Sequence, residues 1–324
     1  MSSDPVFSLN PEMLLQCAKI TQLLGRYEGL LSPRPQPLLR RQNRVRTIRD
    51  SLAIEGNTLS IDQVTAIFDG KRVLGPKKEI LEVKNAIRVY DEAPSFNPLT
   101  SKDLRKAHEI LMRGLIEDAG KWRGTDVGIL KGTRGSHLAP RANRVSEFME
   151  NLFGFLKTKE ELHALIKSSI FHYELEFIHP FSDGNGRMGR LWQHVILLHY
   201  HPLFEYIPIE SIIKANQKTY YDVLEKSDKK GDCSVFIDFS LKVILEALAE
   251  FLEQLRLEPL TLETRLEKAS AHFGKRKFSR KDYLAFFKSL STATASRDLQ
   301  QGVERKLIKK FGEKALSKYV FIKK

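Results

Sequence analysis

Twelve consecutive residues of this 324-residue chain combine the side-chain types that act on phosphate groups. They read His179-Pro180-Phe181-Ser182-Asp183-Gly184-Asn185-Gly186-Arg187-Met188-Gly189-Arg190. Gly184 and Gly186 lack a Cβ atom, so successive backbone N–H groups can approach an anion and form a nest for it. The apolar residues from Leu191 to Leu197 predict a helix that starts near Gly186, with its positive end toward the same anion. This segment therefore predicts a site for a phosphate chain.

The charged residues of the segment suit the same ligand. Arg187 and Arg190 are three positions apart, on one side of the predicted helix, and guanidinium pairs bind phosphates well. Asp183 stands directly before the nest, where a carboxylate can hold Mg²⁺. His179 can be neutral near pH 7 and accept a proton from an attacking hydroxyl group. We interpret Phe181 as the apolar anchor of the loop.

A second candidate lies upstream, in the segment Ser51-Leu52-Ala53-Ile54-Glu55-Gly56-Asn57. Ser51 and Glu55 are four positions apart and share one helical face, while Gly56 can end the helix. An ordinary helix end has the same appearance, so this segment alone decides nothing.

Apolar residues recur at helical spacing through most of the chain, as in Ile166, Ile170, Tyr173 and Phe177. Long runs of alternating apolar and polar residues are scarce, so we predict an all-α, mostly helical fold. Residues 123–140 contain four glycines and interrupt this pattern. They predict a short β-hairpin, or flap.

Three regions are predicted. Residues 1–96 form an N-terminal helical region that carries Glu55, and residues 97–257 form the domain with the 179–190 segment. Glu258-Pro259 marks a linker into the third region, residues 258–324.

The third region is basic and has its own pattern of elements. Residues 261–324 hold 17 Lys and Arg against 6 Asp and Glu, whereas the preceding 260 residues hold 36 against 34. We predict helices over Leu262–Phe273, Arg280–Phe287 and from Ser291 or Thr292 to Arg305, then two paired strands around Gly312. Three helices and a hairpin are typical of a winged-helix domain. Its partner is either DNA or a protein, because the helix-turn-helix shape also serves protein contacts.

The 179–190 segment resembles the signature of the Fic family, His-x-Phe-x-(Asp/Glu)-Gly-Asn-Gly-Arg-x-x-Arg, at every fixed position. The resemblance covers roughly residues 97–245 and includes Gly120-Lys121-Trp122-Arg123. It implies a transfer of AMP from ATP to Ser, Thr or Tyr of a target protein, which can be this chain itself. It also implies roles for single residues: His179 as general base; Asp183 as ligand of Mg²⁺; and Gly184, Asn185, Gly186, Arg187 and Arg190 as contacts of the phosphates.

Further roles follow from the same resemblance. The flap resembles the edge that aligns the target side chain; its candidate residues are Gly128, Ile129, Leu130, Lys131, Gly132 and His137. Tyr220 and Tyr221 resemble an aromatic pair at the adenine, although Asp228 stands where some relatives have Asn. Ser51, Glu55 and Gly56 fit the inhibitory motif (Ser/Thr)-x-x-x-Glu-(Gly/Asn), and we expect Glu55 to form a bidentate pair with Arg190.

Three alternatives remain open at this point. A Fic relative could transfer UMP, phosphocholine or a γ-phosphate, or it could remove AMP by a water that Glu55 activates. The chain could instead be a DNA-binding regulator with a Fic fold. The histidine groups His172, Glu174, His179 and His194, His199, His201 could hold a metal ion, but their spacing matches no recognised ligand pattern.

Composition sets the remaining expectations. No apolar run approaches the roughly 18 residues of a membrane span, and the N-terminus lacks the pattern of a secretory signal. Cys17 and Cys233 are far apart and suggest neither a disulfide framework nor a zinc site. We therefore expect a cytoplasmic protein without a membrane partner, and a homodimer is one of the assemblies that the sequence allows.

Overall fold

The computed structural model describes residues 5–28, 37–131, 134–158, 161–257, 261–287, 290–313 and 317–322. The chain divides into two compact units, residues 1–24 with 36–253 and residues 25–35 with 254–324. Most described residues are helical, and the strands are few and short, which confirms the predicted fold class. The division into three regions stays a prediction; in space, residues 36–96 pack within the first unit.

The first unit contains the helices α1 to α11, apart from the last turns of α1 and α11, and one hairpin. The elements are α1 (Pro11–Glu28), α2 (Pro37–Ile54), α3 (Ile61–Phe68), α4 (Lys77–Glu92), α5 (Ser101–Met112), β1 (Gly128–Lys131), β2 (Arg134–Leu138), α6 (Val145–Thr158), α7 (Ala164–Ile178), α8 (Asn185–Tyr200), α9 (Ile209–Ala215), α10 (Gln217–Lys230) and α11 (Ser234–Leu257). Short 3₁₀ turns cover Ala93–Ser95, Ala142–Arg144 and Pro202–Tyr206.

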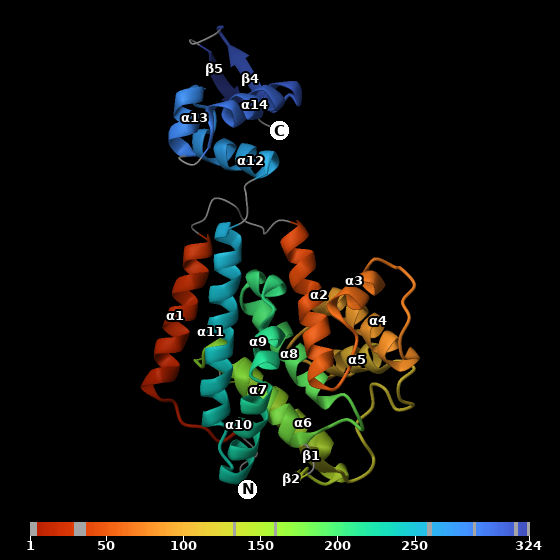
Figure 1. Cartoon of the computed structure of the whole chain (residues 1–324). Coiled ribbons are helices and arrows are strands. Elements are labelled where there is room, and N and C mark those ends of the chain that lie inside the picture. Colours follow the sequence, from red (N-terminus) through yellow and green to blue (C-terminus); the bar gives the residue numbers. More distant parts are fainter. Residues whose placement is uncertain are drawn as a thin grey trace. The chain divides into compact units, whose positions relative to one another are not determined.

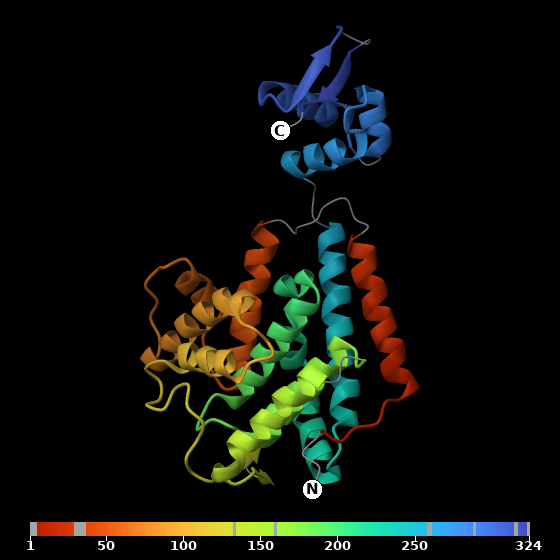
Figure 2. The same ribbon diagram turned by 180° about the vertical axis from the view of Figure 1, so that it is seen from behind.

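Helices α7 and α8 form the centre of this unit and pack along each other. Trp192 of α8 is fully buried and lies against Phe96, Phe153 and Phe171, with ring centroids 6.2–6.5 Å apart. In both Figure 1 and Figure 2, helices α2 to α5 lie on one side of this centre and α1 with α11 on the other. The loop between α7 and α8 therefore joins the two central helices of this unit.

Helix α2 docks against the centre of the unit through α9 and α8. Its buried residues Leu52 and Ile54 are at most 4% exposed. Gly56 adopts φ 95° just after the helix, a conformation that favours glycine. The N–H groups of Gly56 and Asn57 donate back to Ala53 O and Leu52 O, which is a Schellman cap. The predicted helix end at Gly56 is confirmed.

The hairpin β1–β2 is antiparallel and pairs Ile129 with His137, with a shift of register between Ile129 and Leu130. This confirms a hairpin where four glycines interrupt the helical pattern. Gly132 lies outside the described residues, as do the side chains of Ile129, Leu130, Lys131 and His137.

The second unit has three helices and a small antiparallel sheet. These are α12 (Leu262–Phe273), α13 (Arg280–Phe286) and α14 (Thr292–Glu304), with β3 (Phe278–Ser279), β4 (Ile308–Phe311) and β5 (Lys318–Phe321) in the sheet order β3-β5-β4. Ser279 caps α13, and Ser291 caps α14, which then begins at Thr292. The three predicted helices and the β4–β5 pair are confirmed, and β3 is an element that the sequence did not suggest. The winged-helix assignment stays a prediction.

A buried cluster of apolar side chains gives the second unit its own core. The side chain of Asp298 on α14 is 3% exposed and accepts hydrogen bonds from Arg265 Nη2 of α12 at 2.8 Å and Tyr283 OH of α13 at 3.2 Å. These contacts tie the three helices together. The buried cluster consists of Leu266, Ala269, Phe273, Phe278, Tyr283, Phe287, Ala295, Leu299, Ile308 and Phe321.

Among the described residues, no helix combines the length and the apolar character that crossing a bilayer requires.

Candidate active site

The 179–190 segment is the loop between α7 and α8 together with the first turns of α8. His179 caps the C-terminus of α7 in the left-handed region, with φ 52° and ψ 59°. Gly184 caps the N-terminus of α8 with φ 87°. The predicted helix is confirmed, and it starts at Asn185. The unpaired N–H groups of its first turn thus point into the loop that carries His179 and Asp183.

Arg123 holds the backbone of this loop in place. Its guanidinium is buried and donates to His179 O at 2.8 Å and to Thr125 O at 2.8 Å. It also donates to Ile178 O and Pro140 O. One side chain therefore fixes both the left-handed His179 and the two ends of the flap. This arginine belongs to a motif that the sequence shows, but the sequence indicates no role for it.

His108 supports the loop from α5. Its ring stacks on Phe181 with centroids 3.6 Å apart, and Phe181 is fully buried, which agrees with its interpretation as an anchor. His108 Nδ1 accepts from Gly120 N at 2.8 Å, so Nε2 must carry the proton that it donates to Asp183 O at 2.9 Å. Burial lowers the pKa of His108 to about 4, so the ring stays neutral. No sequence pattern marked this residue.

Asn185 closes the loop from within. Its side-chain amide accepts from Phe181 N at 2.9 Å and donates to Phe181 O at 2.8 Å. Asn185 is 2% exposed, so its side chain braces the loop. The side-chain amide of Asn185 therefore stabilises the loop, and a ligand at this position would bind the backbone N–H groups.

Arg187 lies between two carboxylates. Its Nη2 donates to Asp183 Oδ1 at 3.0 Å, and its Nη1 lies 3.5 Å from Glu82 Oε1 of α4. The side chain of Asp183 is 48% exposed, whereas that of Arg187 is 8% exposed. Arg187 Nε is buried and has no hydrogen-bond acceptor. An exposed carboxylate thus stands at the mouth of the loop, next to a guanidinium with an unsatisfied donor.

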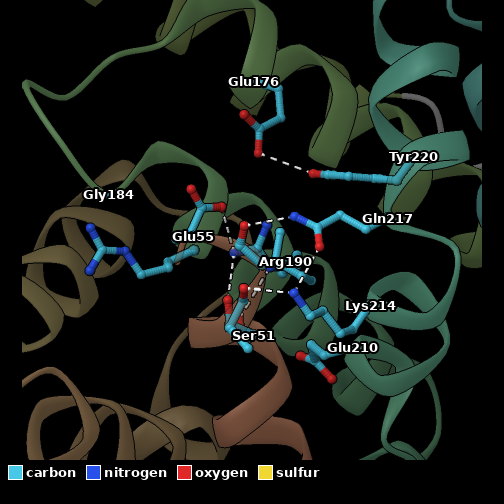
Figure 3. A network of polar contacts seen from close by, with 12 residues as sticks. Ser51, Glu55, Glu176, Gly184, Arg190, Glu210, Lys214, Gln217 and Tyr220 are labelled. Carbon is cyan, nitrogen blue, oxygen red and sulfur yellow. Dashed lines mark hydrogen bonds and ion pairs between the residues drawn. The ribbon is translucent and has the colours of Figure 1, made fainter. Parts of the chain in front are cut away.

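Arg190 is the most buried cation of the site, with a side chain that is 1% exposed. Its Nη2 donates to Glu55 Oε1 at 2.8 Å and to Ser51 O at 3.0 Å, and its Nε donates to Ser51 Oγ at 3.2 Å. Burial lowers the pKa of Arg190, but Glu55, together with Tyr220 and Glu176, more than offsets this and raises the pKa above its usual value. The structure therefore brings Ser51 of α2 and Glu55, the residue directly after this helix, onto the 179–190 segment, as shown in Figure 3.

The contact between Glu55 and Arg190 is a single hydrogen bond, and the expected bidentate pair is wrong. The guanidinium also donates to Ser51, whose backbone and hydroxyl oxygens both accept hydrogen bonds from it. Arg190 Nη1 is left buried without an acceptor.

The Glu55 carboxylate lies directly against the nest. A Cβ atom built on Gly186 would collide with Glu55 Oε1 and would lie 3.4 Å from Arg190 Nη1. The surface of Gly186 is thus open to an anionic oxygen, and in this structure that oxygen comes from Glu55. Arg190 Nη1, which lacks an acceptor, and Gly186, which has no Cβ atom, together form a cradle that fits a phosphate oxygen.

The aromatic pair of α10 is split between two environments. Tyr220 is 1% exposed, and its OH lies 3.0 Å from His172 Nε2. Tyr221 is half-buried, and its OH donates to Ile54 O of α2 at 3.3 Å. Asp228 accepts from Tyr173 OH at 3.1 Å, away from both.

His179 has the tautomer that a general base needs. Its Nδ1 lies 3.3 Å from Glu176 O, and a carbonyl oxygen can only accept, so Nδ1 carries the proton. In the neutral ring Nε2 then holds the lone pair.

Among the described residues, no group of three His, Cys, Asp or Glu side chains is placed to hold a metal ion. His172 instead bonds to Gln193 and Tyr220, and burial lowers its pKa to about 3. A metal ion that phosphates help to bind needs fewer protein ligands, so this finding does not concern Asp183.

Comparison with known proteins gives one consistent family. The model of the Fic/DOC family matches residues 98–197. A crystal structure of a Fic family protein from Desulfovibrio desulfuricans G20 aligns with a TM-score of 0.75 and 37% identity, over 99% of each chain.

Two curated relatives named protein adenylyltransferase Fic are similar over part of their length. The protein from Nematostella vectensis is 30% identical over 239 residues, which are 69% of this chain and 52% of that protein. The protein from Culex quinquefasciatus is 31% identical over 209 residues, 60% of this chain and 39% of that protein. The chain thus matches about half, or less, of the length of these relatives.

Proposed function

The chain belongs to the Fic family, and we propose that it transfers AMP from ATP to a Ser, Thr or Tyr hydroxyl group of a protein. The observation that carries this proposal is the cradle at Gly186, where Glu55 Oε1 lies in the space that a Cβ atom would fill and the buried Nη1 of Arg190 lacks an acceptor. The curated relatives carry the name of this activity. The target can be a second protein or the chain itself.

In the proposed reaction the target's hydroxyl oxygen attacks the α-phosphorus of ATP. A new P–O bond forms, the bond to the oxygen that bridges the α- and β-phosphates breaks, and diphosphate leaves. His179 takes the hydroxyl proton at Nε2, and its bond to Glu176 O keeps the ring in the required tautomer. Arg123 acts through His179, because it fixes the carbonyl group of that residue.

The phosphates are assigned to the N-terminus of α8. The backbone of Gly184, Asn185 and Gly186 and the guanidinium groups of Arg187 and Arg190 would bind them. Asp183 would hold Mg²⁺, since its exposed carboxylate stands at the mouth of the nest. When bound, this ion would neutralise charge on the leaving diphosphate.

Two other parts of the family site are assigned by proposal alone. Tyr220 and Tyr221 would flank the adenine, with Tyr221 as the more exposed of the two. The target would add as an extended strand to the edge of the β1–β2 hairpin, and this would align its side chain. Such pairing needs only the backbone of residues 128–131.

We further propose that Glu55 restrains the enzyme. Its carboxylate takes one donor of Arg190 and covers Gly186, where a phosphate oxygen would otherwise sit. A like charge at this place repels the γ-phosphate and displaces the triphosphate from the in-line geometry. Small misplacements of reacting atoms cost about 10²-fold in rate.

The test of the activity uses the Glu55→Gly protein with ATP that carries a label on its α-phosphate, in a cell lysate. We expect labelled protein bands with Glu55→Gly and a loss of about 10²–10⁴-fold when His179→Ala is added. ATP binding by calorimetry should persist in the double variant, because His179 does not hold the phosphates. Label from the γ-phosphate in place of the α-phosphate would show a phosphotransferase and overturn the proposal.

For the second unit we propose duplex DNA as the partner. One face of α14 exposes Thr292, Arg297 and Gln300, which are side-chain types that contact base edges. Strand β4 exposes Lys309 and Lys310, which suit phosphates of the DNA backbone. The net charge of +11 over residues 261–324, from 17 basic and 6 acidic residues, supports an anionic partner.

This second proposal is tested with a fluorescent duplex and the full-length protein. We expect binding that weakens steeply as salt rises, and that weakens further in Lys309→Glu. Lys242→Glu, an exposed lysine of α11, is the control with the same change of charge. Absent or salt-insensitive binding would favour a protein partner for this unit.

Both cysteines are free and buried, which supports the reducing, cytoplasmic compartment that we propose.

A further inference from the structure

The carbonyl groups in the last turn of α2 receive no N–H donor from within the helix. Each of them accepts a hydrogen bond from another group instead. Leu52 O accepts from the backbone N–H groups of Glu55 and Asn57, at 3.0 and 3.2 Å. Ser51 O accepts from Arg190. The local cap and the active-site arginine thus satisfy the first part of this turn.

The two carbonyl groups directly before Glu55 are bound by side chains from α9 and α10. Lys214 Nζ donates to Ala53 O at 2.8 Å. Gln217 Nε2 donates to Ile54 O at 3.0 Å. Figure 3 shows Lys214 and Gln217 beside Arg190, on the side of α10. The end of α2 is therefore held from outside as well as by its own cap.

Lys214 and Gln217 also hold each other. Lys214 Nζ donates to Gln217 Oε1 at 2.8 Å, so the NH₂ group of that amide must face Ile54 O. The ammonium group stands at the negative end of α2, where a cation is favoured. We call these two side chains the carbonyl latch.

We propose that the carbonyl latch sets how firmly Glu55 occupies the phosphate site, so that Lys214 and Gln217 are positioning residues for inhibition. Ile54 directly precedes Glu55, and the backbone held at Ile54 O is the base from which Glu55 reaches Arg190. Without the latch, the last turn of α2 opens more often, and Glu55 leaves the cradle more often. This inference rests on the proposed transfer of AMP and on the proposed role of Glu55.

The latch has a sharp test because Lys214 touches none of the groups assigned to ATP. Lys214→Met keeps the apolar stem and removes the donor. Since a hydrogen bond from a charged group shifts an equilibrium by roughly ten-fold, we expect AMP incorporation to rise by roughly that factor. The control is Lys218→Met, because the Lys218 side chain is 90% exposed and pairs with Asp222 of its own helix. This control should match the wild type.

The Glu55→Gly background separates the latch from any other effect of the substitution. Once Glu55 is absent there is nothing to position, so Lys214→Met should give no further rise in AMP incorporation. A rise of similar size in both backgrounds would overturn the proposal. An unchanged or lower activity of Lys214→Met in the Glu55 protein, while Glu55→Gly is active, would also overturn it.

Hydrogen exchange tests the latch even if the activity is not AMP transfer. The amides of Glu55, Gly56 and Asn57 donate to the last turn of α2, so their exchange reports its opening. Faster exchange of these amides in Lys214→Met than in Lys218→Met supports the latch. Equal exchange rejects it. If Glu55→Gly incorporates no AMP, the proposed function fails by itself, and this measurement still decides the latch.

Discussion

At the scale of single residues, the site depends on a strained backbone and on the side chains that hold it. His179 adopts φ 52°, a conformation that costs an L-residue on the order of 1–2 kcal/mol. Arg123 offsets this cost, because its buried guanidinium binds the carbonyl group of His179 and three others. The proposed base is thus placed by an arginine whose guanidinium binds backbone carbonyl groups.

Replacing Arg123 with lysine tests this arrangement. Lysine cannot serve all of these carbonyl groups, so buried acceptors lose their donors. We expect Arg123→Lys to lower the free energy of unfolding by roughly 2–4 kcal/mol in urea denaturation. Arg105→Lys is the control, since Arg105 is exposed and its guanidinium lies over the ring of Trp122. Equal stability of the two variants would show that Arg123 does not hold the loop.

The contrast between His179 and Arg123 shows what the sequence could tell. His179, Asp183 and the nest are neighbours along the chain, so their combination is visible as a motif. Arg123 lies 56 residues before His179, and His108 lies 75 residues before Asp183. Only the fold brings these pairs together, and neither residue type indicates a partner by itself.

At the scale of elements, α2 is the helix that brings the residues of the proposed inhibition to the site. Its position in sequence is remote from α8, yet Ser51 and Glu55 are bound by Arg190. The sequence predicted a helix end at Gly56 and a face that carries both residues. It could not predict the carbonyl latch, because hydrogen bonds to backbone carbonyl groups leave no pattern in the residues that accept them.

Gly56→Ala tests the cap of α2. No atom lies within 4 Å of a Cβ built on Gly56, so the cost is the backbone conformation alone, about 1–2 kcal/mol. We expect lower stability in thermal unfolding and, because the end of α2 loosens, higher AMP incorporation. The control is Gly124→Ala, which has open space and no positive φ. Higher stability with unchanged activity would contradict the account.

The interface of α2 with α9 also contains a buried carboxyl group. Glu210 is 2% exposed, and Tyr90 OH donates to its Oε1 at 2.8 Å. Its other oxygen is buried without a partner. Burial, with a further contribution from Asp50 of α2, raises the pKa of Glu210 to about 7, although the nearby Arg190 lowers it.

This raised pKa predicts a pH dependence of stability. The folded protein keeps the proton of Glu210 up to about pH 7, whereas the unfolded chain releases it near 4.5. The contribution of Glu210 to the free energy of unfolding is fully present below pH 4.5 and is lost as the pH rises to about 7. Relative to Glu210→Gln, the wild type should lose up to about 1.4 kcal/mol per pH unit across this window. Parallel curves for the two proteins from chemical denaturation would contradict the assignment.

At the scale of the whole molecule, charge and core separate the two units. Residues 261–324 carry a net charge of +11 from 17 basic and 6 acidic residues, and the remaining 260 residues carry +2 from 36 and 34. The second unit has its own buried cluster, with every member between residues 266 and 321. For the second unit, the amino-acid composition showed the positive charge, and residues that can cap helices indicated where its helices begin. The short β3 strand escaped prediction because two residues carry no periodicity.

Removing residues 258–324 tests the independence of the first unit. Since the base, the nest and both arginines lie in residues 179–190, a Glu55→Gly protein without this region should incorporate AMP as the longer variant does. The same deletion should abolish the binding of duplex DNA, measured by fluorescence anisotropy. Loss of AMP incorporation by a truncated protein that still unfolds cooperatively would show that the catalytic unit needs its neighbour.

We propose above all that the carboxylate of Glu55, the residue directly after α2, withholds Arg190 from the phosphates of ATP. The most direct measurement is AMP incorporation at saturating Mg-ATP by the wild type, Glu55→Gly, Arg190→Ala and the double variant, read by intact-protein mass. We predict low incorporation by the wild type, a rise of about 10²-fold in Glu55→Gly, and none in either variant that lacks Arg190. A Glu55→Gly protein no more active than the wild type would contradict the claim, as would an active double variant.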